Sequence, residues 1–286
     1  MKKILIIGSH GMAGHVIKRI LVESKKFNVF DIARNNEFGD VSYKLDVSDF
    51  GKLGNVILEL RPHYIINCIG ILNNDAENHP AKAVLINSYL PHFLAEKCDI
   101  VEAKLIHISS DCVFSGLSGD HKENDFKDGI GFYAQSKALG EVVYGKHLTI
   151  RTSIIGPELK ANGIGLLHWF LNQKSQINGY TNALWSGVTT LQLAKSIFFI
   201  INENDVSGIV HLSNNEKISK YDLLMNFKKL FDRKSLLIIP HGEYIVDKSV
   251  LNTRVDFNPP IPSYEQMLKE LKDWVINNIN YYNYTL

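Results

Sequence analysis

The chain has 286 residues, of which 45% are hydrophobic and 21% are charged. This composition is typical of one large or two smaller globular domains and excludes a disordered protein. Its 31 Lys and Arg residues nearly balance 30 Asp and Glu residues, and no dense basic run or nucleic-acid motif occurs. We therefore expect neither nucleic acid nor a membrane as a partner.

Cysteine spacing and the N-terminal run predict where the protein works. Cys68, Cys98 and Cys112 are far apart and form no CxxC pair, which favours a reducing compartment over a disulfide frame or a zinc site. The 11 histidines form no HxxxH or Cys/His cluster, so no catalytic metal is expected. The apolar run after Lys3 stops at Gly8, too soon for a signal peptide. No stretch approaches the roughly 20 apolar residues of a membrane span. We expect a cytoplasmic protein.

Predicted strands and helices alternate through the first half of the chain. The expected strands are 4–7, 27–32, 41–45, 64–67, 104–109 and 148–152, and the expected helices are 12–23, 49–60, 81–97 and 132–144. Repeated β-α-β units of this length predict an α/β fold with a doubly wound parallel sheet, the Rossmann arrangement.

The second half is less regular. It carries expected helices at 163–171, 191–201, 221–231 and 264–276 and one expected strand at 208–212. We predict an NAD(P)-binding Rossmann domain over residues 1–156, to which 184–212 return, and a smaller C-terminal substrate-binding lobe formed by 157–183 and 213–286. The Asn/Tyr-rich tail 277–286 is expected to be frayed or loosely docked.

A glycine loop directly follows the first expected strand. It reads Gly8-Ser9-His10-Gly11-Met12-Ala13-Gly14 and precedes the first expected helix. Glycines in this context permit a tight turn, close approach to a pyrophosphate and close helix–strand packing, and the helix N-terminus offers free N–H groups. We expect Gly8, His10, Gly11, Met12, Ala13 and Gly14 to bind a dinucleotide.

The end of the second strand governs the choice between NADPH and NADH. An acidic residue there would bind the ribose 2′-hydroxyl, whereas an arginine accommodates a 2′-phosphate. With the strand ending near Ala33, Arg34 follows it, which favours NADPH. A two-residue shift would give the role to Asp31, so NADH stays open. Asp46 and Val47 are expected to border the adenine.

Tyr133 and Lys137 are four residues apart and share one face of an expected helix. A neighbouring ammonium favours the phenolate, so we expect Lys137 to lower the pKa of Tyr133 toward neutrality. Ser110 ends the strand before this helix and supplies a hydroxyl that can orient a carbonyl. Ser110, Tyr133 and Lys137 are therefore the expected catalytic residues, and Tyr133 and Lys137 also reach the cofactor.

With these motifs, the chain resembles the extended short-chain dehydrogenase/reductases, and most of all the dTDP-4-dehydrorhamnose reductases and related sugar-nucleotide reductases. Residues 108–116, ISSDCVFSG, resemble that family's ISTDYVFDG, and residues 133–141, YAQSKALGE, match YGx[ST]KxxGE. The resemblance implies that Cys68, Ile69 and Gly70 lie along the bound cofactor and that Asn87 occupies the asparagine position of the following helix. It implies contacts with substrate for four residues: Ser110, Asp111, Tyr133 and Arg254. It also implies that residues 151–153, RTS, lie near the site.

The resemblance implies an NADPH-dependent oxidoreductase that reduces a nucleotide-linked 4-keto-6-deoxy sugar for surface polysaccharide biosynthesis, with a homodimer as a possible assembly. Ile154 stands where the rhamnose reductases carry a pocket tryptophan, and Cys112 replaces a tyrosine, so the nucleotide and the sugar stay open. Two alternatives remain: an epimerase or dehydratase that retains its NAD, and a non-catalytic NADP-binding regulatory subunit like the one paired with methionine adenosyltransferase.

Overall fold

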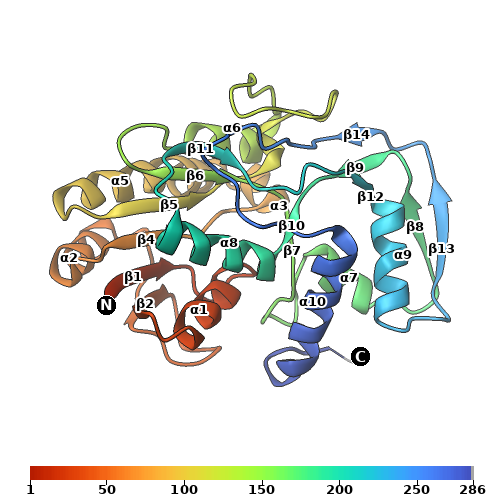
Figure 1. The fold of residues 1–286 in the computed structure, drawn as a ribbon, viewed down its shortest axis with the longest axis horizontal. Coiled ribbons are helices and arrows are strands. Elements are labelled where there is room, and N and C mark those ends of the chain that lie inside the picture. The colour runs from red at the N-terminus through yellow and green to blue at the C-terminus, as the bar shows by residue number, and fades with distance from the viewer. Residues whose placement is uncertain (285–286) are drawn as a thin grey trace.

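A seven-stranded sheet forms the centre of the larger part of the molecule (Figure 1). The computed structural model describes residues 1–284. The strand order is β11-β6-β5-β4-β1-β2-β3, and every neighbouring pair is parallel. The chain winds outward in both directions from the β1–β4 pair, which confirms the predicted doubly wound fold. The glycine loop follows β1 and therefore lies at this switch point.

The strands of this sheet match the apolar runs of the sequence. They are β1 (Lys2–Ile7), β2 (Phe27–Ala33), β3 (Tyr43–Lys44), β4 (Tyr64–Asn67), β5 (Lys104–Ile108), β6 (Leu148–Arg151) and β11 (Gly208–His211). Alternate side chains of β1 enter different cores: Ile4 and Ile6 face one, Leu5 and Ile7 the other. A strand buried on both faces reads as a continuous apolar run, which is why β1 was predictable.

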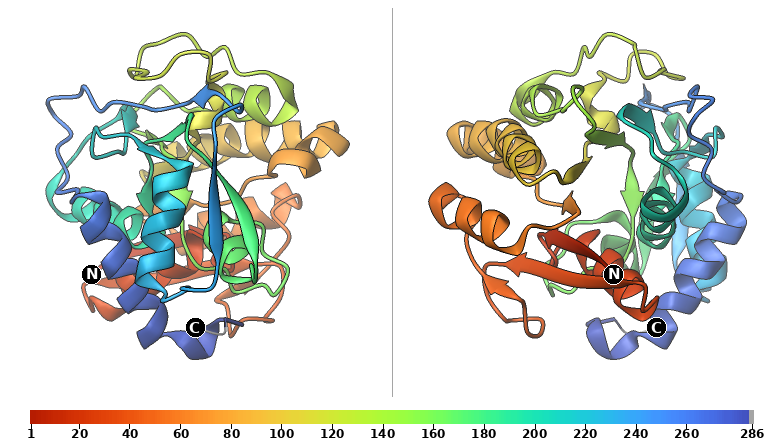
Figure 2. Two further views of the ribbon diagram at one scale, coloured as in Figure 1. Left: turned by 90° about the vertical axis from the view of Figure 1, so that its right-hand side faces the viewer. Right: turned by 60° about the vertical axis from the view of Figure 1, so that its left-hand side comes forward.

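Helices cover both faces of the sheet (Figure 2, right). One layer contains α2 (Phe50–Leu60) and α5 (Leu90–Ile100), and the other contains α1 (Gly14–Glu23) and α8 (Thr190–Glu203). The helix that carries Tyr133 and Lys137 is α6 (Gly131–Leu139). Short helices α3 (Asn73–Asn78) and α4 (Pro80–Ala83) lead into a π-helical stretch at Val84–Tyr89. Within residues 1–284, no helix is both long enough and apolar enough to cross a membrane.

The remaining elements form the smaller part of the molecule. Its helices are α7 (Leu166–Leu171), α9 (Lys220–Leu230) and α10 (Tyr264–Asn277). Its strands are β7 (Ile154–Ile155), β8 (Gln176–Tyr180), β9 (Ala183–Trp185), β10 (Val188–Thr189), β12 (Ile218–Ser219), β13 (Leu237–His241) and β14 (Val246–Asp247). They pair as β7–β10, β8–β13 and β12-β9-β14. Most of these strands are too short to leave a recognisable pattern in the sequence.

One expected helix is shorter in the structure. The prediction of a helix over 132–144 is wrong at its end, because α6 stops at Leu139. Gly140 follows, packed so closely on the π-helical stretch that a Cβ there would lie 1.8 Å from the carbonyl oxygen of Asn87. Close packing, rather than helix propensity, sets this boundary.

Candidate active site

The glycine loop folds into a tight cradle that only glycine permits at two positions. Gly8 has a φ of +87°, and a Cβ there would lie 2.6 Å from Ile69 Cγ1. A Cβ on Gly14 would lie 2.1 Å from the carbonyl oxygen of Gly8, so α1 starts against the loop backbone. Among the described residues, the amides of Met12 and Ala13 donate to no backbone acceptor. Free amides at the start of α1 suit the pyrophosphate of a dinucleotide.

The loop after β4 borders this cradle from the other side. Cys68 donates its amide to Ile7 O at 3.0 Å, and Ile69 touches Gly8. Asn87 holds the next turn, because its side chain accepts the Ile71 amide at 2.8 Å and donates to Ile71 O at 2.9 Å. Gly70 lies beside the Asn87 amide. The residues expected to pass the cofactor are thus brought to the cradle, and their binding role stays a prediction.

On the adenosine side, Arg34 and Asp31 have different surroundings. β2 ends at Ala33, so exposed Arg34 follows it. Asp31 is 2% exposed, and its carboxylate is bonded to Lys18 Nζ (2.9 Å) and to the amide and hydroxyl of Ser42 (3.0 and 3.1 Å). A carboxylate bonded in this way is not available to a ribose hydroxyl. The placement supports the NADPH interpretation.

Asp46 and Val47 differ in what they can offer a ligand. Asp46 is exposed, and its carboxylate accepts from the amide and hydroxyl of Ser48 at 3.0 and 2.8 Å. The side chain of Val47 is 5% exposed and packs in the core beside α2. The core holds the Val47 side chain, so only its backbone is free to border the adenine, and that role stays a prediction. His10 lies at the loop, with its ring edge-on to Phe38 at 5.6 Å between centroids.

Helix α6 is held in place at both ends. At its start, Gly131 has a φ of +91°, and the Glu77 carboxylate on α3 accepts the amide of Tyr133 at 3.1 Å. At its end, Gly140 permits the close contact with Asn87. Lys137 is 3% exposed, and its Nζ donates to Ile108 O at 2.8 Å. Burial lowers the pKa of Lys137 to about 8, although Glu141 and Cys68 oppose the shift.

Ser110 and Tyr133 face one another at the end of β5. The Ser110 hydroxyl donates to Asp111 Oδ1 and accepts the Cys112 amide, both at 3.0 Å. Burial raises the pKa of Tyr133, with Cys112 and Asp111 adding to the rise and Ser110 opposing it. The expected lowering of the Tyr133 pKa by Lys137 is therefore wrong. The physical reason is that burial dominates, while the Lys137 ammonium bonds to Ile108 O instead.

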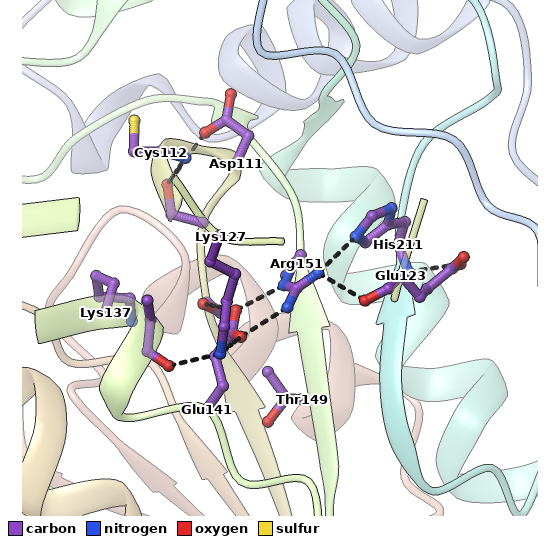
Figure 3. Close-up of polar contacts among 12 residues, drawn as sticks. Asp111, Cys112, Glu123, Lys127, Lys137, Glu141, Thr149, Arg151 and His211 are labelled. Atoms are coloured by element: carbon purple, nitrogen blue, oxygen red, sulfur yellow. Dashed lines mark hydrogen bonds and ion pairs between the residues drawn. The ribbon is translucent and has the colours of Figure 1, made fainter. Parts of the chain in front are cut away.

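A buried ionic network lies behind these residues (Figure 3). Arg151 on β6 forms a two-pronged pair with Glu141, with Nε–Oε1 at 2.7 Å and Nη2–Oε2 at 2.8 Å. Its Nη1 donates to Glu123 O at 3.0 Å and to His211 Nε2 at 3.2 Å. Because Nε2 accepts, Nδ1 of His211 carries the proton that bonds Leu251 O at 2.9 Å. Burial lowers the pKa of His211 to about 4, which keeps the ring neutral.

Arg254 does not reach this site. Its Nη1 donates to Ser207 O and Ile209 O at 3.0 and 3.1 Å, and its guanidinium pairs with Asp256. These carbonyls lie at the start of β11, whereas Ser110 follows the carboxyl end of β5 in the same parallel sheet. The prediction that Arg254 contacts substrate is contradicted by this placement, because the strand direction puts it at the opposite edge.

Lys220 is a further candidate site residue, which sequence reasoning missed. It begins α9, its Nζ lies 5.6 Å from the centre of the Trp185 ring, and burial lowers its pKa while Asp111 and Cys112 oppose the shift. The lysine thus faces the segment after Ser110 from the smaller part of the chain. A single lysine after a helix-capping Ser219 carries no signal in the sequence, because the contact is made only by tertiary packing.

The doubly wound sheet, the glycine cradle and the Ser110, Tyr133 and Lys137 set define the class of extended short-chain dehydrogenase/reductases. Within this class, the family model described as the RmlD substrate binding domain matches residues 1–244. The chain belongs to this family.

Similar proteins carry two different descriptions. A dTDP-4-dehydrorhamnose reductase of Aggregatibacter actinomycetemcomitans is 27% identical over 235 residues, covering 78% of this chain and 76% of that protein. Methionine adenosyltransferase 2 subunit beta of Xenopus tropicalis is 24% identical over 282 residues, covering 91% and 80%. The structure of a dTDP-4-dehydrorhamnose reductase from Bacillus anthracis in complex with NADP matches with a TM-score of 0.80 at 21% identity, covering 94% of this chain and 98% of that one. This last likeness concerns the fold.

Proposed function

We propose that this protein is an NADPH-dependent reductase that converts the 4-keto group of a nucleotide-linked 6-deoxy sugar to a hydroxyl, for surface polysaccharide biosynthesis. The observation that carries the proposal is the placement of Ser110 and Tyr133 together, with Lys137 buried on the same helix, at the edge that holds the glycine cradle. The similarity to enzymes named dTDP-4-dehydrorhamnose reductase, one of them solved with NADP, supports the substrate class and the cofactor.

The proposed chemistry divides between cofactor and protein. Bound NADPH would supply a hydride to the carbonyl carbon. Tyr133 donates a proton to the carbonyl oxygen, and Ser110 orients that oxygen with its hydroxyl. The Tyr133 phenol is protonated at neutral pH and has a proton to donate, although the rise in its pKa on burial makes it a weaker acid in this structure.

Lys137 contributes charge. Its ammonium bonds Ile108 O in this structure and would have to turn toward Tyr133 to stabilise the tyrosinate that remains after proton transfer. The pKa of about 8 leaves the ammonium mostly charged at pH 7. The same group is suited to hold a ribose hydroxyl of the cofactor, and Arg34 at the end of β2 is suited to the 2′-phosphate.

We also propose that residues 157–183 and 213–286 serve as the substrate-binding lobe, and that Asp111 and Lys220 face the sugar nucleotide there. Asp111 directly follows Ser110, the Lys220 ammonium lies over the Trp185 ring and senses the Asp111 charge, and a half-buried cation there suits an anionic ligand. A cytoplasmic location and a homodimer stay predictions.

Oxidation of NADPH and NADH, followed at 340 nm against 4-keto-6-deoxy sugars carried on dTDP, UDP, GDP and CDP, tests the proposal. We expect turnover with at least one substrate, faster with NADPH, and loss of turnover in Tyr133→Phe. The exposed neighbour Phe132 provides the control, because Phe132→Leu changes the same helix without touching the phenol. No turnover on any of the four would refute the reductase proposal.

A second candidate function has specific support. The match to methionine adenosyltransferase 2 subunit beta covers 91% of this chain, which favours a non-catalytic regulatory subunit that binds NADP. Under this alternative, NADPH would bind but no 4-keto sugar would be reduced, and Tyr133→Phe would leave the biological role intact. Under the epimerase or dehydratase alternative, tightly retained oxidised cofactor would be found after purification. The substrate panel and the purified cofactor content separate the three.

A further inference from the structure

The C-terminal tail is ordered against the glycine loop. Residues 279–284 follow α10 and turn back to α1, where Tyr282 contacts His15 (Figure 2, right). Tyr282 and Tyr284 are 7% and 9% exposed, and their rings stack at 5.6 Å with an angle of 22°. Of the two expectations for the tail, frayed or loosely docked, fraying is wrong for residues 279–284, which are docked, while 285–286 lie outside the described part. Burial of two phenols in a terminal segment requires specific contacts that hold the segment against the rest of the chain.

Tyr282 connects to the loop through a histidine. His15 Nδ1 lies 2.8 Å from Gly11 O, and its Nε2 lies 3.1 Å from the Tyr282 hydroxyl. A carbonyl only accepts, so Nδ1 carries the proton, and Nε2 accepts from Tyr282, whose oxygen in turn accepts from Trp274 Nε1 at 3.1 Å. Burial lowers the pKa of His15 to about 4, so this neutral tautomer persists at pH 7. The chain of bonds runs from α10 to the carbonyl of Gly11.

Tyr284 holds the opposite side of the loop. Its hydroxyl accepts the Glu158 amide at 2.8 Å, and the Glu158 carboxylate accepts the Gly165 amide at 2.5 Å. A Cβ at Gly165 would lie 3.2 Å from Met12 Sδ, so this turn rests on the glycine loop. The tail therefore braces both α1 and the segment that covers Met12.

The tail also forms a wall of a cavity at the same place. A cavity of about 370 Å³ opens beside the loop, and its lining includes Ser9, His10, Phe38, Leu159 and Tyr282. Ser9 and His10 of the glycine loop line this cavity together with Tyr282, so a dinucleotide seated on the loop would lie beside it. The tail thus borders the space next to the cofactor.

We propose that residues 279–284, named here the C-terminal strap, position the glycine loop for the dinucleotide, with Tyr282 as a positioning residue that acts through His15 on Gly11. The consequence for affinity rests on the proposed NADPH site. The effect of the strap on the order of the glycine loop does not depend on that site, so NADPH affinity and loop order are measured in separate experiments.

The first experiment measures NADPH binding by fluorescence titration of the full chain. Tyr282→Phe removes one hydroxyl and keeps the ring, so we expect the Kd for NADPH to rise about five- to tenfold, with KM rising similarly and kcat held within twofold. The matched control is Tyr144→Phe, which deletes the same kind of phenol–imidazole bond, to His92 at 2.9 Å, on the other face of the sheet. The control should leave Kd unchanged.

A second variant tests the route of the effect. His15→Asn can keep a donor near Gly11 O but loses the nitrogen that meets Tyr282. In that background, Tyr282→Phe should add less than twofold to Kd, because the link is already cut. Full additivity of the two changes would overturn the proposed route.

Hydrogen exchange of the protein without cofactor is the readout that does not depend on the proposed function. The His15 amide bonds Gly11 O at 3.2 Å, and we expect its exchange to accelerate in Tyr282→Phe and not in Tyr144→Phe. If wild-type protein binds no NADPH, the proposed function fails while exchange still tests the strap. Unchanged exchange, or a lower Tm with unchanged Kd and KM, would overturn the strap proposal.

Discussion

Glu141, buried against Arg151, is expected to be among the residues at which loss of a single charge costs this fold the most stability. The two side chains are 0% and 2% exposed and meet through two bonds of 2.7 and 2.8 Å. Glu141→Gln keeps the shape and removes the charge, leaving the Arg151 guanidinium buried without its counter-ion. Removal of one partner of a buried pair costs about 3–5 kcal/mol. Urea unfolding should show that loss as a lower midpoint at constant slope.

Two further variants show whether the charge is the cause. Exposed Glu59 on α2 provides the control, and Glu59→Gln should change the unfolding free energy by less than about 0.5 kcal/mol. Adding Arg151→Met to Glu141→Gln removes both charges and should recover part of the loss. A loss below about 1 kcal/mol for Glu141→Gln, or a double variant no more stable than the single one, would refute the reasoning.

The same pair gives a pH dependence with a definite sign. Arg151, Lys127 and Ser109 hold the pKa of Glu141 below its ordinary 4.5, in spite of burial. A lowered pKa in the folded state adds stability above the unfolded pKa and loses it as pH falls through the folded pKa. The stability difference between wild type and Glu141→Gln should therefore be full at pH 7 and shrink progressively below about pH 4.5.

The remaining predictions concern the site. Tyr133→Phe should lower kcat by about 10²–10⁴-fold while Kd for NADPH stays within twofold, and a retained kcat would point to another proton donor. Arg34→Ala should raise KM for NADPH on the order of 10- to 100-fold and leave KM for NADH unchanged; equal rises would contradict a 2′-phosphate contact. Gly14→Ala should abolish NADPH binding in a titration, because its Cβ would lie 2.1 Å from Gly8 O, whereas Gly51→Ala in α2 should bind normally. kcat should fall as pH rises through about 8, where the Lys137 ammonium is lost, and a pH profile flat to pH 9.5 would exclude a need for that charge.

The parts predictable from sequence are those whose determinants are local. The run 4–7 is apolar because β1 is buried on both faces, and the glycines follow it because the switch point needs a turn and a close approach. Tyr133 and Lys137 share a helix, so their spacing is visible in the chain. Ser110 follows from its place at the end of β5. These features need only neighbours in sequence and the rule of parallel strands.

The parts that were missed depend on contacts between distant segments. Strand β8 (Gln176–Tyr180) alternates buried and exposed residues over only five positions, two of them Gly179 and Asn178, so no strand pattern stands out. Arg254 and Lys220 are both cations in the second half of the chain, yet packing takes one away from the site and brings the other to it. The raised pKa of Tyr133 likewise follows from burial, which spacing does not reveal.

The order of the C-terminal tail beside the glycine loop also depends on contacts between distant segments. An Asn/Tyr-rich terminus is polar by composition and has no helical or strand period, which favours fraying. Tyrosine, however, carries a large apolar ring and one hydroxyl, and it is stable when buried if that hydroxyl has a partner. His15 and the Glu158 amide supply those partners for Tyr282 and Tyr284. Both partners come from segments that flank the glycine loop. We therefore expect a substitution that loosens the tail to loosen the loop as well, and the reverse.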